Sequence, residues 1–396
     1  MSSTRHKNFD KVLSSKLSAM KTNGTLKNFR EISSPMNDKV VINKQKTVVL
    51  SSNNYLGLSA NKEVVAAGIA ALKKYGAGTA SVRFICGTFS IHKKIEKKIA
   101  SFFGFPAALT YVSCWAANTG LIPAIAVEGD VIITDQLNHA SLIDGIRMSK
   151  AERKIYKHSD MAELEKHLKE SQSFKTRYII TDGVFSMEGD IAKLEKIAAL
   201  AKRYDAVTIV DDSHGTGVLG KKGSGIIEHY GLKGKIDILT STLGKALGGA
   251  AGGFVAGSRS LIDYLSQVSR PQLFSNALPP TVAGSALKAI EVLEKNPSLV
   301  KKLHENTAYF RKKLIELGLN PLPGESAIVP VIVGETAKAI SLSNELFKRG
   351  VFVTGFGYPV VPEGTARIRF QMSAALSRKE LDGVLSVIKD VLTKNT

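Results

Sequence analysis

The chain has 396 residues, of which 44% are hydrophobic and 22% are charged. This length and composition are typical of a globular protein with one large domain and a smaller one, and they exclude a largely disordered chain. Lys and Arg number 54 against 35 Asp and Glu, so the formal net charge is +19. A basic surface attracts polyanions, which include nucleic acids, acidic lipids and phosphorylated cofactors.

Further features narrow the class of protein. The basic residues form no tail, and their densest group, at residues 93–98, has the spacing of a solvated helix face, so we expect no nucleic-acid partner. Two cysteines, Cys86 and Cys114, are too few for a disulfide framework and indicate reduced thiols in a cytoplasmic protein. The uncharged residues 107–127 contain polar residues and Pro123, which favours a buried strand and helix over a membrane span. The first residues lack the apolar segment of a secretory signal, and a transit peptide is not favoured.

The first 50 residues are predicted to form an arm with a helix and one or two short strands. β-rich segments then alternate with helical patterns, which favours a mostly parallel sheet covered by helices on both faces. Strands are predicted at residues 107–112, 131–134, 178–181, 206–210 and 236–241, and helices at residues 91–103, 161–170 and 194–204. Because ligands bind at the carboxyl ends of strands in such sheets, polar residues just beyond a strand end are candidate site residues.

After residue 280 amphipathic helices are interleaved with strands. The helices are predicted at residues 281–294, 297–317, 335–349 and 377–392, and the strands near residues 328–333, 351–354 and 366–370. This pattern indicates a second, smaller α+β domain. The predicted organisation is therefore an N-terminal arm (1–50), a large α/β domain (51–285) and a small C-terminal domain (286–396).

Three of the predicted strands run into polar residues. Those residues are Asp211 and His214 after one strand, Thr242 and Lys245 after another, and Ser186 after the third. Lys245 also lies among glycines, which leave no side-chain bulk around it. The carboxyl ends of parallel strands meet at one edge of a sheet, so we expect these side chains to share one site.

These residue types suit pyridoxal phosphate. A lysine amine condenses with the cofactor's aldehyde, and a crowded, partly apolar, cationic site lowers the pKa of that amine and keeps it nucleophilic. A carboxylate, here Asp211, pairs with the pyridine nitrogen so that the ring accepts electrons from a carbanion. The phosphate needs N–H groups at a helix start, expected at Cys114 and Trp115, and a hydroxyl, which Thr242 supplies.

Other interpretations of the same residues stay open. An acidic pair at a strand end also occurs as a helix cap or a metal ligand, and a Gly-Lys pair is often a surface turn. Lys245 is not in a phosphate-binding P-loop, because Ala246 follows it where a Ser or Thr is needed. The glycine-rich residues 248–253 lead into an apolar strand, whereas a dinucleotide-binding loop leads into a helix.

Six segments resemble a known family, and the resemblance spans nearly the whole chain. Three of them are similar to stretches shared by the α-oxoamine synthases, a branch of the fold-type I pyridoxal-phosphate enzymes: residues 53–57, 87–88 and 138–141. Three others resemble, more specifically, the members of that branch that use glycine and acetyl-CoA: residues 80–88, 273–276 and 354–362. One departure is Trp115, where a smaller aromatic residue such as Phe is expected.

The resemblance implies a role for each candidate residue. Lys245 would form the Schiff base and move the substrate's α-proton, and Asp211 would pair with the pyridinium. His214 would bond the 3′-oxygen of the ring or brace Asp211, and His139 would stack on the ring face. The remaining implied roles are cofactor contacts by Cys114, Trp115, Ser186 and Thr242, contacts from Ser275 and Asn276 to the phosphate region of a partner subunit, and binding of the substrate carboxylate by Asn53 and Arg369.

The resemblance also implies a fold and partners. The expected fold is a large domain with a mostly parallel seven-stranded sheet covered by helices, plus a smaller C-terminal α+β domain. The expected assembly is a homodimer that shares its active sites, with glycine and acetyl-CoA as substrates and with no metal ion and no membrane. Alternatives are condensation of alanine with a pimeloyl thioester, amine transfer without a thioester, and a non-catalytic scaffold or basic nucleic-acid-binding protein. Intact Lys245, Asp211 and His214 argue against the non-catalytic alternatives.

Overall fold

The computed structural model describes residues 7–27 and 29–392. Its central element is a seven-stranded sheet made of β3 (Ala107–Tyr111), β4 (Val131–Asp135), β5 (Glu152–Tyr156), β6 (Arg177–Asp182), β7 (Ala206–Asp211), β8 (Ile238–Thr242) and β9 (Gly253–Gly257). The strand order is β3-β9-β8-β7-β6-β4-β5. Within this described sheet, only β9 runs antiparallel to its neighbours, so the predicted mostly parallel sheet is confirmed.

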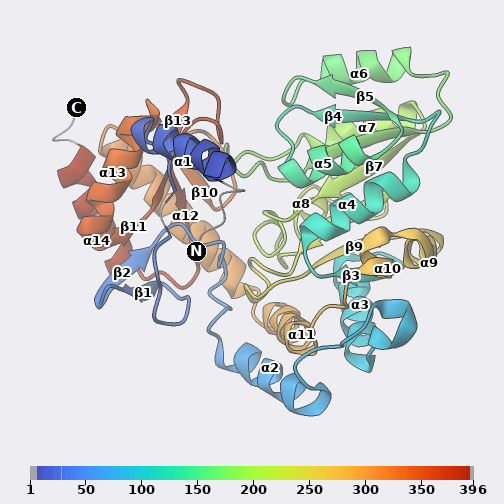
Figure 1. Ribbon diagram of the computed structural model, residues 1–396, viewed down its shortest axis with the longest axis horizontal. Helices are drawn as coiled ribbons and strands as arrows, with labels where there is room; N and C mark the ends of the chain where they lie inside the picture. Colours follow the sequence, from blue (N-terminus) through green and yellow to red (C-terminus); the bar gives the residue numbers. More distant parts are fainter. Residues whose placement is uncertain (1–6, 28, 393–396) are drawn as a thin grey trace.

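Helices cover both faces of this sheet (Figure 1). One face packs against α4 (Cys114–Ile125), α5 (Ala140–Met148) and α9 (Arg259–Val268), and the other against α3 (Ser90–Phe103), α6 (Met161–Glu170) and α7 (Leu194–Arg203). Successive strand residues supply the two apolar cores alternately, because side chains of a strand point to opposite faces. On β4, Ile132 enters one core, while Val131 and Ile133 enter the other.

The predicted elements of this region match the structure closely. All five predicted strands are present, with ends that differ by at most two residues, and α6 occupies the predicted residues 161–170. The uncharged residues 107–127 form β3 and α4, as expected. The sequence did not indicate β5, because this edge strand exposes Glu152 and Arg153 and lacks an apolar pattern. Charged residues on an edge strand prevent pairing with other chains.

The N- and C-terminal parts of the chain together form the smaller body (Figure 1). One of its sheets has the order β10-β13-β12 and is antiparallel: β10 (Ile328–Gly334), β13 (Ala366–Gln371) and β12 (Thr354–Phe356). In the other sheet, β2 (Gln45–Val49) lies between β1 (Lys39–Ile42) and β11 (Val351–Phe352). β2 pairs in parallel with β11, so the predicted N-terminal arm joins the C-terminal domain.

The remaining helices connect or flank these two bodies. They are α1 (Lys7–Thr22), α2 (Lys62–Tyr75), the π-helical turn η2 (Arg83–Gly87), α8 (Ile226–His229), α10 (Arg270–Phe274), α11 (Pro280–Lys295), α12 (Ser298–Glu316), α13 (Thr336–Lys348) and α14 (Arg378–Leu392). The proposed boundary between residues 285 and 286 lies inside α11, which packs against α2 and α3. No helix in the described ranges is both long enough and apolar enough to span a bilayer.

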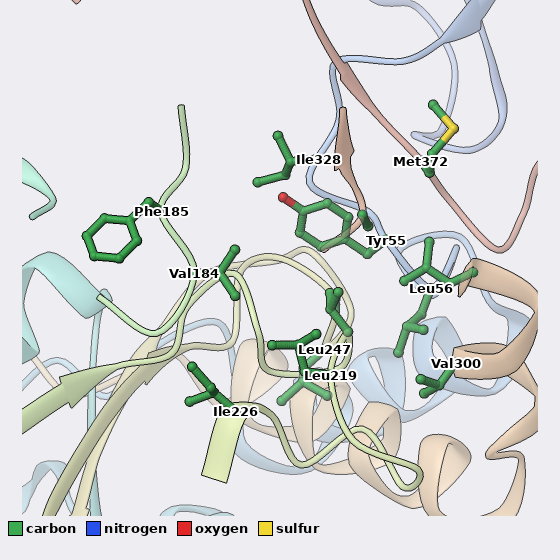
Figure 2. Close-up of a cluster of buried hydrophobic side chains, with 14 of the residues drawn as sticks. Tyr55, Leu56, Val184, Phe185, Leu219, Ile226, Leu247, Val300, Ile328 and Met372 are labelled. Carbon is green, nitrogen blue, oxygen red and sulfur yellow. The ribbon is translucent and has the colours of Figure 1, made fainter. Parts of the chain in front are cut away.

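One apolar cluster joins the large body to the smaller one (Figure 2). Tyr55 comes from the segment after β2, Val184 and Leu219 come from loops beyond the sheet, and Val300 and Ile328 come from α12 and β10. Each is at most 3% exposed. Burying a side chain of this size stabilises the fold by roughly 1.5–3 kcal/mol. The cluster therefore fixes β13 and its neighbours relative to the carboxyl ends of the central strands.

His158 ties three segments together at that same edge of the sheet. Its Nδ1 lies 3.0 Å from Asp135 at the end of β4, and its Nε2 lies 2.9 Å from Asp190 in the loop after β6. The ring also packs edge-on against Phe185, with centroids 4.4 Å apart. Burial alone lowers the pKa of His158, but the two carboxylates outweigh it and raise the pKa to about 10. An imidazolium at neutral pH thus holds the loop that carries Ser186.

The interaction of His158 with Asp135 and Asp190 leads us to predict that the stability of the protein depends on pH. Because the folded-state pKa of His158 is raised, its stabilising contribution is complete below pH 6.5 and is lost as pH rises through about 10. His158→Gln should therefore lower the free energy of unfolding by about 3 kcal/mol at low pH and by much less above pH 10. Urea denaturation of both proteins at each pH measures the difference.

The matched control is His229→Gln, because His229 forms only a longer, more exposed pair with Glu325 at 3.6 Å. That variant should change the unfolding free energy by less than about 1 kcal/mol at either pH. A cost of His158→Gln that stays constant through the whole pH range would contradict the assignment of an imidazolium.

Candidate active site

A cavity of about 230 Å³ opens at the carboxyl ends of β6, β7 and β8. It is lined by Ser113, Cys114, Trp115, His139, Ser141, Asp182, Val184, Ser186, Asp211, Ser213, His214, Thr242 and Lys245. Eight of the predicted site residues lie in this lining: Cys114, Trp115, His139, Ser186, Asp211, His214, Thr242 and Lys245. Segments more than 130 residues apart in the sequence thus meet at one point, because parallel strands bring their ends to a common edge.

Lys245 follows β8 and points its amine at His214. The distance from Lys245 Nζ to His214 Nε2 is 2.9 Å. Burial lowers the pKa of Lys245, although the charge of Asp211 opposes the shift. Burial, followed by the charge of Lys245, also holds the pKa of His214 well below its usual range. A buried amine beside a neutral imidazole is poised to act as a nucleophile or a base.

Asp211 is the last residue of β7 and is 3% exposed. Its carboxylate accepts hydrogen bonds from Asn118 Nδ2 at 2.6 Å, from the Ser213 N–H at 3.0 Å and from the Cys114 thiol at 3.5 Å. Among the described residues, these three donors hold Asp211 in place, whereas the side-chain hydrogen bonds of His214 go to Lys245 and Tyr55. Within the described part of the chain, no hydrogen bond joins His214 to Asp211, and the other inferred role, contact with the cofactor, stays a prediction.

His139 caps the N-terminus of α5 at the wall of the cavity. Its Nδ1 lies 2.8 Å from Ser141 Oγ, and its backbone N–H donates to Asp182 at 2.8 Å. The imidazole packs edge-on against the Trp115 indole, with centroids 6.0 Å apart. Burial lowers the pKa of His139. The hydrogen bonds of His139 thus fix its imidazole at the wall of the cavity.

The first turn of α4 forms another wall of the cavity. Ser113 caps this helix by accepting from the Ala116 N–H at 3.0 Å. β9 lies directly against the helix start, where a Cβ on Gly253 would come within 2.3 Å of the Cys114 nitrogen. Thr242 Oγ1 accepts from the Gly244 N–H at 3.0 Å and also lines the cavity. A helix start with a nearby hydroxyl is a favourable position for a phosphate.

Arg369 and Asn53 lie beside the cavity and not in its lining. Arg369 Nη1 donates to the Ser186 carbonyl at 2.7 Å, and its Nε has no partner among the described residues. Arg367, on the same face of β13, instead forms an ion pair with Glu188 at 3.0 Å. No carboxylate in the described ranges lies within ion-pair distance of Arg369, so this buried guanidinium is the one available to an anionic ligand.

Ser275 and Asn276 follow α10, outside the cavity of this chain. Asn276 is exposed and Ser275 is half-buried. The role predicted for them requires a second subunit and therefore stays a prediction.

Four polar residues of the site were not singled out from the sequence. Asn118 contacts Asp211 from the position one helical turn after Cys114, and this i, i+4 spacing was the available signal. Gln371 continues the alternation of Arg367 and Arg369 on β13, so strand periodicity placed it on the same face. Asp182 ends β6 as Asp211 ends β7, and Tyr55 lies in the family-like residues 53–57, so both had a signal, although their contacts depend on segments far away in the sequence.

Comparisons with known proteins agree with this geometry. Residues 45–388 match the model of the family described as "Aminotransferase class I and II". The chain is 46% identical over 377 residues to 8-amino-7-oxononanoate synthase 1 of Bacillus velezensis, which covers 95% of this chain and 96% of that protein. It is 44% identical over 382 residues to the mitochondrial 2-amino-3-ketobutyrate coenzyme A ligase of Homo sapiens, with coverage of 96% and 91%.

Solved structures are similar over almost the entire length. Serine palmitoyltransferase of Sphingomonas wittichii superposes with a TM-score of 0.92 at 28% identity, covering 99% of both chains. A structure described as SPT with a PLP internal aldimine superposes with a TM-score of 0.93 at 28% identity, covering 98% of both chains. The fold and the presence of a pyridoxal-phosphate site are thereby shared with the proteins that this chain resembles.

Proposed function

The chain belongs to the aminotransferase class I and II family and, within it, to the α-oxoamine synthases, and on that premise we propose that it condenses glycine with acetyl-CoA. The products would be 2-amino-3-oxobutyrate and free coenzyme A. The observation that carries the proposal is the buried amine of Lys245, which contacts His214 in a cavity that Asp211 also lines. The similarity to 2-amino-3-ketobutyrate coenzyme A ligases supports glycine and acetyl-CoA as the substrates.

Pyridoxal phosphate is the cofactor of this family, and the residues present fit it. The amine of Lys245 suits its aldehyde, and the carboxylate of Asp211 suits its pyridine nitrogen. The first turn of α4, with Thr242, offers N–H groups and a hydroxyl to its phosphate. His139 supplies a flat wall for the ring. When bound, the cofactor withdraws electrons from the α-carbon of an attached amino acid.

The protein's own residues then supply binding, orientation and proton transfer. Arg369 binds the carboxylate of the amino acid with its guanidinium, whose Nε has no partner among the described residues, and so fixes the direction of the α C–H bond. Lys245 Nζ takes the α-proton as general base, and burial, which lowers the pKa of its amine, favours the form that can accept a proton. Asn118 and Cys114 hold Asp211 in position throughout. The α-carbon joins the acyl carbon of the thioester, and the thiolate of coenzyme A leaves.

A second candidate is condensation of alanine with a pimeloyl thioester, as in 8-amino-7-oxononanoate synthases. The 46% identity to the Bacillus velezensis enzyme favours it as strongly as the other relatives favour glycine and acetyl-CoA. The two candidates share the cofactor, Lys245, Asp211 and Arg369. They differ by one methyl group on the amino acid, by the length of the acyl chain, and by the release of the amino acid's carboxyl group as CO2 in the alanine reaction.

The first prediction from the proposed function concerns attachment of the cofactor to Lys245. Trp115 is the only tryptophan of the sequence and lines the cavity, so pyridoxal phosphate should quench its emission in both wild type and Lys245→Ala. Borohydride should fix the cofactor covalently in the wild type, and Lys245→Ala should lose this linkage and lower turnover by about 10²–10⁴-fold. Mass spectrometry reads the linkage, and Lys301→Ala, a change at an exposed lysine, is the control. Covalent fixation at another lysine would contradict the assignment of Lys245 as the cofactor-binding lysine.

The substrate prediction requires a two-by-two panel. Glycine or alanine is combined with acetyl-CoA or pimeloyl-CoA, and release of coenzyme A is followed with a thiol reagent. We expect kcat/KM for glycine with acetyl-CoA to exceed that for alanine with pimeloyl-CoA by at least about tenfold, the usual scale of discrimination by a methylene-sized difference. Lys245→Ala measures background hydrolysis. The opposite preference would establish the second candidate in place of the first.

The third prediction is that the chain forms a homodimer. Phe84 and Ile85 of η2 and Phe274 of α10 are 64%, 68% and 72% exposed, and these two elements pack together. Exposed apolar residues of this size next to Ser275 and Asn276 suit burial by a second copy. Sedimentation equilibrium should give twice the chain mass of 42.6 kDa, and Phe274→Asp should shift it toward one chain. Tyr264→Asp, at a 49% exposed aromatic, is the control, and a wild-type monomer would refute the proposal.

A further inference from the structure

A chain of four hydrogen bonds connects Arg369 to Lys245. Arg369 Nη2 donates to Gln371 Oε1 at 3.2 Å, and Gln371 Nε2 donates to the Tyr55 hydroxyl at 3.0 Å. The Tyr55 hydroxyl lies 2.8 Å from His214 Nδ1, and His214 Nε2 lies 2.9 Å from Lys245 Nζ. Tyr55 and Gln371 are 0% and 1% exposed, and the Tyr55 ring lies within the apolar cluster (Figure 2).

The direction of this chain is set at its Arg369 end. A guanidinium only donates, so the side-chain atom of Gln371 that faces Arg369 must be the amide oxygen. The amide nitrogen of Gln371 then points at the Tyr55 hydroxyl, whose oxygen accepts. The hydroxyl hydrogen of Tyr55 therefore turns to another acceptor. Its closest one is His214 Nδ1 at 2.8 Å, because the amide oxygen of Asn53 lies farther away at 3.4 Å.

That donation decides which nitrogen of His214 carries the proton. An Nδ1 that accepts from Tyr55 has no hydrogen of its own, so a neutral His214 carries its proton on Nε2. The Nε2–H then faces Lys245 Nζ and needs a lone pair there. A neutral amine has that lone pair and an ammonium group does not. We propose that Gln371 and Tyr55 are positioning residues that fix the tautomer of His214 and thereby hold Lys245 as a free amine.

Protonation of Lys245 requires the chain to reverse. His214 would have to move its proton to Nδ1, and the Tyr55 hydroxyl would have to donate to Asn53 at 3.4 Å in place of His214 at 2.8 Å. In the reversed arrangement His214 Nδ1–H donates across the 2.8 Å contact, and the Tyr55 hydroxyl hydrogen has only the 3.4 Å contact to the Asn53 oxygen, which already accepts from Gln371 Nε2 at 2.5 Å. A hydroxyl hydrogen that is poorly bonded in a buried site is costly. The arrangement links the amine to the guanidinium proposed to bind the substrate carboxylate. The inference thus deepens the proposed function, since it rests on Lys245 as the cofactor-binding amine.

Other groups that face Lys245 also influence its protonation. They are Cys114 from α4, His139 before α5, Asp182 from β6, Asp211 from β7 and Arg369 from β13. Burial lowers the pKa of Lys245 before any of these charges is counted. A variant that changes only the hydroxyl of Tyr55 leaves all of them in place, so the difference from the wild type isolates the hydrogen-bond chain.

The test measures the pKa of Lys245 in the full-length, cofactor-free protein. A limiting amount of acetic anhydride labels neutral amines, and mass spectrometry of the Lys245 peptide gives the extent of labelling at each pH. Tyr55→Phe should raise the pKa by about one unit, the size of one net hydrogen bond. Tyr178→Phe is the matched control, because it removes a buried hydroxyl that donates to the Ile125 carbonyl at 2.9 Å, away from the cavity. An unchanged pKa in Tyr55→Phe would overturn the proposal.

Gln371→Glu tests whether the direction of the chain matters. A glutamate cannot donate, so it accepts from Tyr55, and Tyr55 must then accept from His214 Nδ1. The lone pair of Nε2 would face Lys245 and favour its ammonium form, and the pKa of Lys245 should rise further than in Tyr55→Phe. The double variant Tyr55→Phe/Gln371→Glu has no hydroxyl to connect residue 371 with His214. The glutamate should then raise the pKa of Lys245 only by the effect of its added charge. An equal effect of Gln371→Glu with and without the hydroxyl would reject the relay.

The tautomer of His214 can also be observed without altering the relay. In wild-type protein with ¹⁵N-labelled histidine, the two ring nitrogens of each tautomer have different chemical shifts, and His214→Gln identifies the signals. We expect the Nε2–H form, and the Nδ1–H form would disprove the proposal even if Tyr55→Phe failed to fold. Both measurements work without cofactor or substrate. A protein that failed the borohydride or turnover tests would therefore still give an independent answer here.

Discussion

The site depends on the charge of the buried Lys245 amine. The groups around a buried amine determine whether it is protonated. The neighbours of Lys245 include three acids, Asp182, Asp211 and Asp212, at the ends of adjacent strands. Burial, reinforced by the nearby charge of Asp211, raises the pKa values of Asp182 and Asp212 well above their usual range. The acids therefore add less negative charge than their number suggests. Asp211, with three hydrogen-bond donors, is the acid held as an acceptor beside the amine.

The site also requires that the large body and the smaller body of the chain keep a fixed relative position. Asp211 ends β7 and Lys245 follows β8 of the central sheet, whereas Arg369 and Gln371 belong to β13 of the smaller body. The apolar cluster around Tyr55 joins the bodies, and the loop held by His158 delivers the Ser186 carbonyl to Arg369. A shift of this loop would change both the cavity wall and the partner of the guanidinium. The packing of this loop therefore affects the hydrogen bonding of Arg369.

Periodicity and strand ends made most of the fold and half of the site predictable. Asp211, His214 and Lys245 follow apolar strands, so their convergence follows from the geometry of a parallel sheet. Other contacts depend on tertiary structure that no local pattern encodes. Tyr55 meets His214 across 159 residues, and Gln371 meets Tyr55 across 316 residues. From the sequence alone, Tyr55 is expected to be a core residue, because the position of its hydroxyl becomes known only from the structure.

We expect the substrate preference to depend on a different part of the molecule from the amine of Lys245. The residues around Lys245 are mostly buried at strand ends, which leaves them little freedom to vary without loss of the cofactor site. The segments that resemble glycine-using enzymes include residues that are exposed in the single chain, where Phe84, Ile85 and Tyr358 are 64%, 68% and 60% exposed, and the proposed dimer would bury Phe84 and Ile85. Surface segments on a rigid scaffold can change specificity while the chemistry stays constant. We therefore expect acyl-chain choice to follow these segments, which explains how relatives with different substrates are similar over nearly the same length.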